Sequence, residues 1–340
     1  MKNFIFALSV SLAACLPSGD LLEEFPTISL TNVTMAEFDA PIEARWDGPH
    51  MDISFPDPSI IQDKKDGKWK GYATSSNNKR IPIAESADSV NWKFLNKDAL
   101  PDLPSWIDNN DRGLWAPDVF RDDKGHYVMY FAGKQAGGRR CIGVATAATW
   151  EGPFKDIGRP LICDQAGGGA IDANAFDDGS QRWIMWKVDG NALGGATTCT
   201  GGEKSSDYKP TPIKIQRVAR DGITLQGSPK TILNHNGAAD DGLVEGPAMY
   251  KIHPDQYVLF FSTHCYSSDR YDIQYAFSRT PDGPYTRAGI LAQSGGNPPI
   301  YGPGHMDIDK GEYVAFHGRT APGNPQGSKR YMFTGRIDFV

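Results

Sequence analysis

The sequence predicts an all-β protein built as a five-bladed β-propeller. Five aromatic and β-branched segments recur along the chain, and their first aromatic residues lie roughly 60 residues apart. No stretch shows a sustained apolar pattern with the helical period, which argues against an α/β fold. Each repeat has room for four short strands at hairpin spacing, the composition of one propeller blade. A β-sandwich with accidental similarity among its strands is the alternative.

The strands can be placed in order within each repeat. A turn leads into the first strand in PDPSII, APDVF, IDANAF, EGPAMY and GPGHMDI. The second strand is the aromatic one, in DGKWKGYATS, KGHYVMYFAG, GSQRWIMWKV, HPDQYVLFFST and KGEYVAFHGR. Stretches such as IGVATAATWEGPFKDIGRPLI then supply two more strands around a Gly-Pro turn. Because innermost strands line the central channel of a propeller, the turns that start them should ring one mouth of that channel.

The N-terminus has the pattern of an export signal. A lysine precedes the short apolar run FIFALSVSLAAC, which ends in small residues. We therefore expect a signal peptide at 1–18, an N-terminal lead-in at 19–45 and the propeller domain at 46–340. The run is too short to span a bilayer, and no other segment approaches the length needed, so a secreted protein without a membrane partner is expected. LAAC also resembles a bacterial lipoprotein cleavage box, so lipid anchoring through Cys15 is the alternative.

Charge and cysteine content limit the partners further. The chain of 340 residues has a net charge of −6, and its basic residues are scattered, so the electrostatic footprint of a nucleic-acid-binding protein is missing. A monomer is expected. Without Cys15, four cysteines remain, an even number that permits three disulfide pairings in an oxidising compartment. Cys199 and Cys265 fall in corresponding loops of adjacent blades, and Cys141 and Cys163 flank outer strands of one blade, so these two pairings are favoured.

Three of the five turns at the channel mouth carry an acid: Asp57, Asp172 and Glu245. Hydrolysis of a glycosidic bond needs one carboxylic acid to protonate the leaving oxygen and one carboxylate to activate water or attack the sugar. A third acid nearby can raise the pKa of the first. An aspartate before proline is common at turns, and Asp118 in APDV is interpreted as such a structural turn residue. Recurrence at matched blade positions distinguishes the other three.

The motifs DPSII, LWAPDVF, IDANAFDDG, VEGP and GPGHMDI occur in an order that resembles the glycoside hydrolases of family 43. This resemblance implies a five-bladed propeller that acts on arabinose- and xylose-containing polysaccharides with inversion of configuration. Position by position, it implies that Asp57 is the general base, Glu245 the general acid and Asp172 the residue that tunes the acid. Leu243 and Val244 are expected to help keep the acid protonated. In an inverting enzyme the two catalytic carboxyl groups stand about 6.5 to 9.5 Å apart.

Other residues of the mouth are candidates for binding. Trp115 is placed to stack on a sugar or to pack between blades, and His264, Tyr266 and Arg319 lie in loops that face the site. The resemblance places His305 beside the tuning aspartate or against a calcium or sodium ion bound largely through water; no cofactor is required. A propeller lectin that binds sugar without cleaving it, and a retaining fructosidase, are the alternative functions. Arabinose versus xylose and endo versus exo action stay open.

Overall fold

The computed structural model describes residues 27–30, 46–195, 197–200, 207–310, 313–324 and 328–339. The expected signal peptide, Cys15 and most of the lead-in lie outside these residues. Within the described ranges, no helix is both long and apolar enough to cross a membrane.

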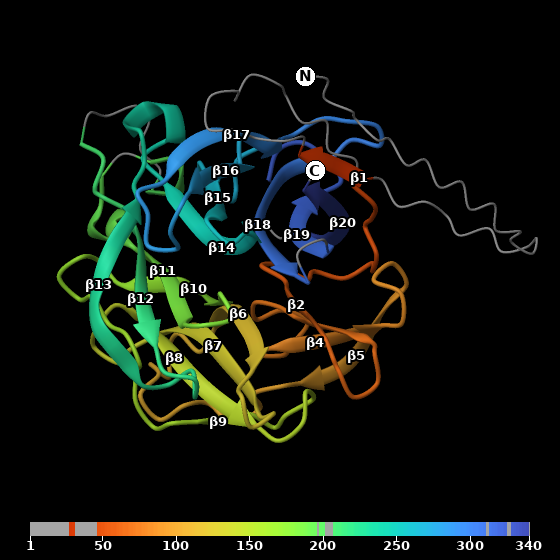
Figure 1. Ribbon diagram of the computed structural model, residues 1–340, viewed down its shortest axis with the longest axis vertical. Coiled ribbons are helices and arrows are strands. Elements are labelled where there is room, and N and C mark those ends of the chain that lie inside the picture. The colour runs from red at the N-terminus through yellow and green to blue at the C-terminus, as the bar shows by residue number, and fades with distance from the viewer. Residues whose placement is uncertain are drawn as a thin grey trace, which may run out of the picture.

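Five four-stranded sheets are arranged around a central channel, which confirms the predicted propeller (Figure 1). Blade 1 consists of β2 (Ser59–Gln62), β3 (Trp69–Tyr72), β4 (Pro82–Ser86) and β5 (Trp92–Asp98). Blade 2 consists of β6 (Leu114–Arg121), β7 (Tyr127–Lys134), β8 (Arg140–Ala147) and β9 (Lys155–Asp156). Blade 3 consists of β10 (Ala170–Asp177), β11 (Arg182–Val188), β12 (Ile213–Val218) and β13 (Leu225–Leu233).

The remaining two blades complete the ring. Blade 4 consists of β14 (Val244–His253), β15 (Gln256–Thr263), β16 (Asp272–Ser278) and β17 (Thr286–Ala292). Blade 5 consists of β18 (Tyr301–Asp309), β19 (Tyr313–Arg319), β20 (Tyr331–Phe339) and β1 (Thr27–Leu30). Three short 3₁₀ helices lie in loops between strands: η1 (Gly190–Leu193), η2 (Thr198–Thr200) and η3 (Gly237–Asp240).

Blade 5 is completed by a strand from the other end of the chain. Strand β1 pairs in parallel with β20, and Thr27 lies opposite Arg336. A bridge between Asp47 and Thr334 adds a second connection between the two ends of the propeller. The lead-in expected at 19–45 therefore contributes to a sheet, because blade 5 takes only three strands from its own repeat.

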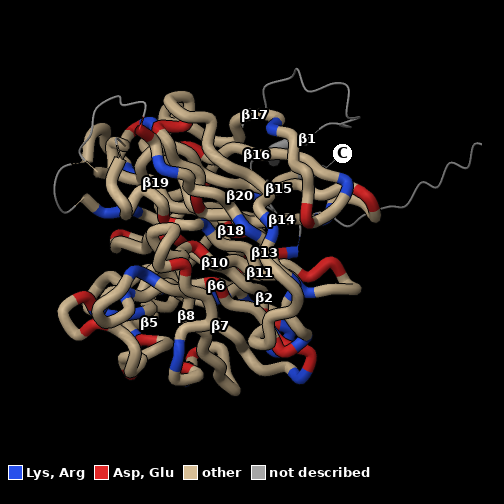
Figure 2. Tube along the Cα trace, turned by 90° about the vertical axis from the view of Figure 1, so that its left-hand side faces the viewer, with Lys and Arg blue, Asp and Glu red and all other residues tan. Residues whose placement is uncertain are grey.

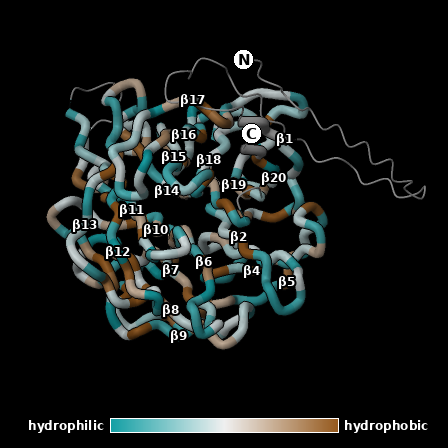
Figure 3. The backbone as a smooth tube through the Cα atoms, viewed as in Figure 1, coloured by the Kyte–Doolittle hydropathy of each residue, from teal (hydrophilic) through white to brown (hydrophobic). Residues whose placement is uncertain are grey.

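The hydrophobic core is divided into five clusters, and each cluster lies between two neighbouring blades. Blades 1 and 2 bury Tyr72 with Phe131, and blades 4 and 5 bury Phe260 with Phe316. The cluster that joins blade 5 to blade 1 contains Met332, and it closes the ring. Hydrophobic residues are accordingly spread over all five blades (Figure 3). Removal of apolar surface from water thus holds each blade to the next.

Two disulfides form between the predicted pairs of cysteines. Cys141 in β8 is bonded to Cys163 in the loop after β9, and Cys199 is bonded to Cys265. The second bond ties the long loop after β11 in blade 3 to the loop after β15 in blade 4. In the view of Figure 2, positions of basic and acidic residues are interspersed along the trace.

Candidate active site

One backbone feature recurs at the start of all five inner strands. Each has a residue in the left-handed region, with φ between 44° and 58°: Asp57, Ala116, Asp172, Gly246 and His305. Pairing with the second strand shifts register at this residue in blades 2 to 5. Bulges of this kind bend a strand and redirect its side chains. We call these five residues the ring positions. A non-glycine residue in the left-handed region costs about 1–3 kcal/mol, and such residues cluster at functional sites.

Hydrogen bonds between blades hold the ring positions in place. At four of them, the backbone N–H donates to a side chain of the preceding blade. Asp57 N donates to His317 Nδ1 (3.1 Å), Ala116 N to Thr74 Oγ1 (2.7 Å), Gly246 N to Asp172 Oδ2 (3.0 Å) and His305 N to Ser262 Oγ (2.9 Å). Ring closure and placement of the site therefore depend on the same contacts.

Asp57, Asp172 and His305 converge at the mouth of the channel. His305 Nδ1 lies 3.8 Å from Asp57 Oδ1 and 4.0 Å from Asp172 Oδ2. The other two ring positions carry minimal side chains, and a Cβ at Gly246 would lie only 3.1 Å from His305 Nδ1. Two carboxylates and an imidazole thus share one small space, and the alanine and the glycine keep that space open.

The three predicted acids are largely buried but reach solvent. Their side chains are 12% exposed at Asp57, 9% at Asp172 and 11% at Glu245. They come from blades 1, 3 and 4. A small part of each side chain is therefore accessible to solvent.

The Asp57 carboxylate accepts hydrogen bonds from two side chains: Arg330 Nη1 donates to Oδ1 at 2.8 Å, and Thr74 donates to Oδ2 at 2.6 Å. His317 Nδ1, which accepts the N–H of Asp57, lies 3.1 Å from Oδ1. Burial alone would raise the pKa of Asp57, but Arg330 and the contact with His317 outweigh burial and hold this pKa well below its usual value. Burial and Arg330 lower the pKa of His317 to about 4, so the imidazole is neutral near pH 7. Asp57 is therefore a fixed carboxylate.

The pKa of Asp172 is shifted in the opposite direction from that of Asp57. Burial raises the pKa of Asp172 to about 6, and the charges of Glu245 and Asp57 act in the same direction, while His305 and Lys187 oppose them. Its Oδ2 accepts the N–H of Gly246, the residue that follows Glu245. Asp172 thus holds the backbone next to Glu245 and can carry a proton near neutral pH.

Glu245 lies one residue before the ring position of blade 4. Leu243 and Val244 beside it are fully buried. The carboxylate itself contacts a cation, because Lys187 Nζ donates to Oε2 at 2.8 Å. The apolar surroundings expected from the sequence therefore describe the backbone of Glu245 but not its carboxyl group.

A second pair of carboxylates lies in the inner strands, two residues beyond the ring positions. Asn174 Nδ2 donates to Asp118 Oδ1 (3.1 Å) and to Asp307 Oδ1 (3.2 Å). Burial, followed by the charge of Asp307, raises the pKa of Asp118 well above its usual value, and burial raises the pKa of Asp307 to about 6. The assignment of Asp118 to a turn was wrong, since it is a buried residue of β6 that accepts the N–H of Ala175 in blade 3.

Two of the predicted binding residues are exposed aromatics. Trp115 is 37% exposed, and the Arg140 guanidinium lies 3.2 Å from its ring centroid. Tyr266 is 46% exposed, with Arg330 at 4.8 Å from its ring centroid. Arg330 thus connects an exposed aromatic ring to Asp57.

Arg319 and His264 lie beneath the surface. Arg319 is buried and donates to the carbonyl of Tyr266 (3.1 Å) and to Asp269, so it supports the loop that carries Tyr266. His264 is also buried, and its Nδ1 contacts Thr263 Oγ1 at 2.8 Å.

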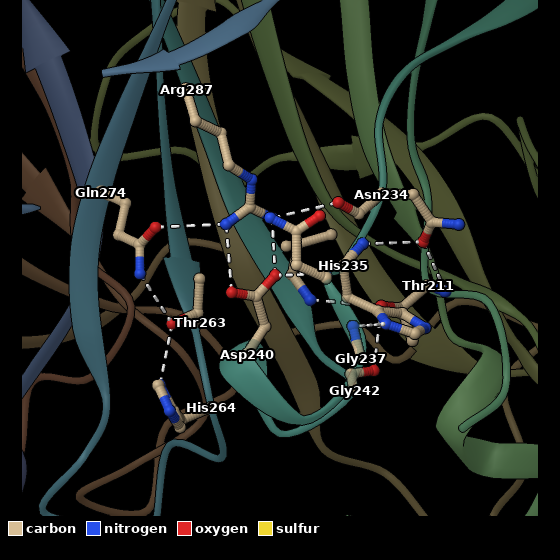
Figure 4. Close-up of polar contacts among 12 residues, drawn as sticks. Thr211, Asn234, His235, Gly237, Asp240, Gly242, Thr263, His264, Gln274 and Arg287 are labelled. Atoms are coloured by element: carbon tan, nitrogen blue, oxygen red, sulfur yellow. Dashed lines mark hydrogen bonds and ion pairs between the residues drawn. The ribbon is translucent and has the colours of Figure 1, made fainter. Parts of the chain in front are cut away.

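His264 belongs to a polar network that continues to the outer strand of blade 4 (Figure 4). Gln274 joins Thr263 to Arg287, and Arg287 forms an ion pair with Asp240 at 2.6 Å. Asp240 in turn accepts the N–H groups of Leu243 and His264 through its carbonyl oxygen. This network braces the loop that leads into Glu245.

The structure adds site residues that the sequence interpretation missed. Lys187 could have been identified from the sequence, because a lysine in the apolar strand RWIMWKV requires a charged partner. No local sequence pattern marks Arg330 and His317, because both contact Asp57 across the junction between blades 5 and 1.

A metal ion has little direct support in this arrangement. Among the described residues, no group of three or more His, Cys, Asp or Glu side chains could hold an ion. Calcium takes six to eight oxygen ligands, and His305 Nδ1 faces two carboxylates that Arg330, Thr74 and Gly246 already engage.

A five-bladed ring with carboxylates gathered at one mouth is the architecture of a glycoside hydrolase propeller. Residues 47–339 match the model of the glycosyl hydrolases family 43, and the chain belongs to this family.

Known relatives agree with this assignment. The chain is 26% identical over 267 residues to the β-D-galactofuranosidase xynD of Aspergillus niger, covering 69% of this chain and 68% of that protein. It is 29% identical over 275 residues to a probable arabinan endo-1,5-α-L-arabinosidase A of Emericella nidulans, covering 74% and 77%. A crystal structure of a thermostable family-43 glycoside hydrolase superposes with a TM-score of 0.69 at 26% identity, covering 84% of this chain and 90% of that one. The protein is thus a hydrolase of glycosidic bonds.

Proposed function

We propose that this protein is a secreted, inverting glycoside hydrolase that cleaves arabinofuranosyl or xylosyl linkages in plant cell-wall polysaccharides such as arabinan and arabinoxylan. The observation that carries the proposal is the opposite setting of two neighbouring carboxyl groups. Arg330 holds Asp57 as a carboxylate, whereas burial lets Asp172 keep a proton near pH 6. Asp57 is thus suited to act as a base, and Asp172, which accepts the N–H of Gly246 next to Glu245, is suited to tune that acid.

In this proposal, Asp57 is the general base. Its carboxylate accepts a proton from the water that attacks the anomeric carbon on the face opposite the leaving group. A carboxylate paired with Arg330 is a weak base, but the transition state resembles an oxocarbenium ion, so the attacking water becomes acidic as its bond to carbon forms. A weak base at a fixed position is sufficient for this step.

Glu245 is the general acid, and Asp172 tunes it. Glu245 donates a proton to the glycosidic oxygen while the bond from carbon to that oxygen breaks. Asp172 lies close enough for its charge to interact with Glu245, and it also holds the backbone of Gly246. Trp115 and Tyr266, both exposed, are the surfaces on which sugar rings stack.

A substrate panel tests the reaction. Purified protein is incubated with arabinan, arabinoxylan, xylan and nitrophenyl furanosides, including a galactofuranoside, and the products are separated by chromatography. Release of arabinose, xylose or their oligomers supports the proposal, and the product sizes decide between endo and exo action. Binding without any product would favour the lectin alternative.

Stereochemistry separates the proposal from a retaining fructosidase. Proton NMR identifies the anomer released first. Inversion is expected, with Asp57 and Glu245 far enough apart to admit a water molecule, about 6.5 to 9.5 Å. Retention would contradict the assignment of Asp57 as a base.

We also propose that the protein is secreted and monomeric. Two disulfides fit an oxidising compartment. N-terminal sequencing of protein from the culture medium should begin after residue 18, while a lipid-modified Cys15 at the N-terminus would indicate anchoring instead. Gel filtration should give a monomer. Binding of a calcium or sodium ion near His305, mostly through water, stays a prediction.

A further inference from the structure

Lys187 is a buried cation at the centre of the acid cluster. Its side chain is 1% exposed, and every residue of its strand β11 is buried. Nζ lies 2.8 Å from Glu245 Oε2 and 3.4 Å from Asp189 Oδ1. Burial alone would lower the pKa of Lys187, but Glu245 and Asp189 outweigh burial and raise this pKa above its usual value. Lys187 therefore keeps its charge.

This contact makes the two oxygens of Glu245 unequal. Oε2 accepts a hydrogen bond from an ammonium group, so a proton on that oxygen would face the donor that already occupies it. Oε1 is the oxygen on which a transferable proton can reside. The backbone is fixed as well, because Gly246 is held at φ 58° and donates to Asp172.

We propose that Lys187 is a positioning residue for the general acid: it holds Oε2 of Glu245, so that Oε1 carries the proton for the leaving oxygen. This inference rests on the proposed function of Glu245. In the step itself, the proton moves from Oε1 to the glycosidic oxygen as the carbon–oxygen bond breaks. Lys187 keeps all three of its protons and neutralises the carboxylate that forms.

Other titratable groups face Glu245 from the elements packed around it. Asp172 in β10 interacts with Glu245 through its charge, Asp189 follows β11 and contacts Lys187, and His305 in β18 contacts Asp172. Tyr271 is buried nearby; burial, then the charges of Glu245 and Asp172, raise its pKa well above the usual value, so it stays neutral. Lys187 also acts on Asp172, so Asp172→Asn/Lys187→Met is compared with Asp172→Asn to assign a change in the pH profile to Glu245.

The pH dependence of kcat/KM tests the inference. Loss of a neighbouring positive charge makes a carboxyl group keep its proton to higher pH, by about 1–3 units for a contact of this length. Lys187→Met should therefore move the basic limb of the kcat/KM profile to higher pH. Asp189→Asn removes a negative charge and frees Lys187 for Glu245, so it should move the same limb downward. Lys187→Arg keeps the charge and should leave the limb near its wild-type position even if kcat falls.

Lys70 provides a matched control. It is the same residue type, fully buried, with Asp66 at 2.7 Å and Glu85 at 2.6 Å, but in blade 1 away from Glu245. Lys70→Met should lower stability without moving the basic limb. An unmoved limb in Lys187→Met, or an equal shift in Lys70→Met, would overturn the inference. If Lys187→Met does not fold, the direction of the shift in Asp189→Asn decides.

Leaving-group dependence separates this inference from the proposed function. A dinitrophenyl glycoside departs without protonation, so both Glu245→Gln and Lys187→Met should lose less activity on it than on an oligosaccharide. If the loss in Glu245→Gln does not depend on the leaving group, Glu245 is not the acid and the proposed function fails. If Glu245→Gln shows the dependence and Lys187→Met shows no shift of the limb, only the role of Lys187 fails.

Discussion

Arg330 Nη1 lies 2.8 Å from Asp57 Oδ1, and this ion pair joins the last blade of the propeller to the first. The same guanidinium lies under the exposed ring of Tyr266. One side chain therefore contacts both the proposed base and an exposed aromatic ring, and it adds one ion pair to the contacts that close the ring.

Replacement of Arg330 should change the acidic limb of the activity profile. Arg330 holds the pKa of Asp57 well below its usual value, so Arg330→Met should let Asp57 take up a proton at higher pH. The acidic limb of the pH profile of kcat/KM should move to higher pH by about 1–3 pH units, the range for a lost opposite charge at this distance. Arg279→Met, which removes an exposed arginine paired with Asp255, is the control and should leave the limb in place. An acidic limb that stays put in Arg330→Met would show that Asp57 does not govern it.

Stability should depend on pH through Asp118 and Asp307. Burial raises the pKa of Asp307 from 3.8 to about 6, so the folded state binds a proton that the unfolded state has lost. This contribution is fully present below about pH 4 and is lost as pH rises through 6, by roughly 2–3 kcal/mol. Urea unfolding from pH 4 to 8 should show wild-type stability falling relative to Asp307→Asn. Asp255→Asn, at an exposed hairpin, serves as the control and should follow wild type across this pH range. Parallel plots of unfolding free energy against pH for wild type and Asp307→Asn would refute the prediction.

The sequence was sufficient for the blades and both disulfides, because the strand pattern repeats along the chain and the cysteines flank identifiable strands. It also singled out Asp57 and Asp172, which both lie near His305, and Glu245, which lies one residue before its ring position. The strand β1 was not foreseen, since its pairing with β20 joins segments from opposite ends of the chain and neither segment carries a local signal for it. Asp118 was misjudged for another reason. Pro58 and Pro117 each follow a ring position; Asp57 precedes Pro58 whereas Asp118 follows Pro117, so the two aspartates differ by two positions along the inner strand.

The two disulfides should contribute unequally to stability. Cys199 and Cys265 are separated by 66 residues, and Cys141 and Cys163 by 22. In the chain-entropy model the longer loop stabilises more, by about 1 kcal/mol, within typical values of roughly 2–4 kcal/mol. Paired Cys→Ala variants compared by urea unfolding should rank in this order. The Cys199/Cys265 variant should also have a higher KM for polysaccharide, because its bond ties the loop after β11 to the loop that carries Tyr266; the reverse ranking would contradict the model.

The exposed aromatics should act on binding more than on chemistry. Trp115→Ala and Tyr266→Ala should each raise KM for arabino-oligosaccharides by about 2- to 10-fold, since aromatic contacts contribute roughly 0.5–1.5 kcal/mol beyond area burial. The value of kcat should change less. Ile290→Ala is a matched control, because Ile290 is 43% exposed on the outer strand of blade 4. Equal effects of all three substitutions would show that the mouth does not hold the sugar through these rings.

The activity of Glu245→Gln and Asp57→Asn on a natural oligosaccharide tests the central claim most directly. Each substitution keeps the size of the side chain and removes one proton-transferring group, with Glu151→Gln in an exposed turn as control. We expect kcat/KM to fall by about 10²- to 10⁴-fold for both site variants, the usual contribution of a general acid or base, while the control stays active. Wild-type turnover in either site variant would contradict the claim that carboxylates from separate blades carry out catalysis at this mouth.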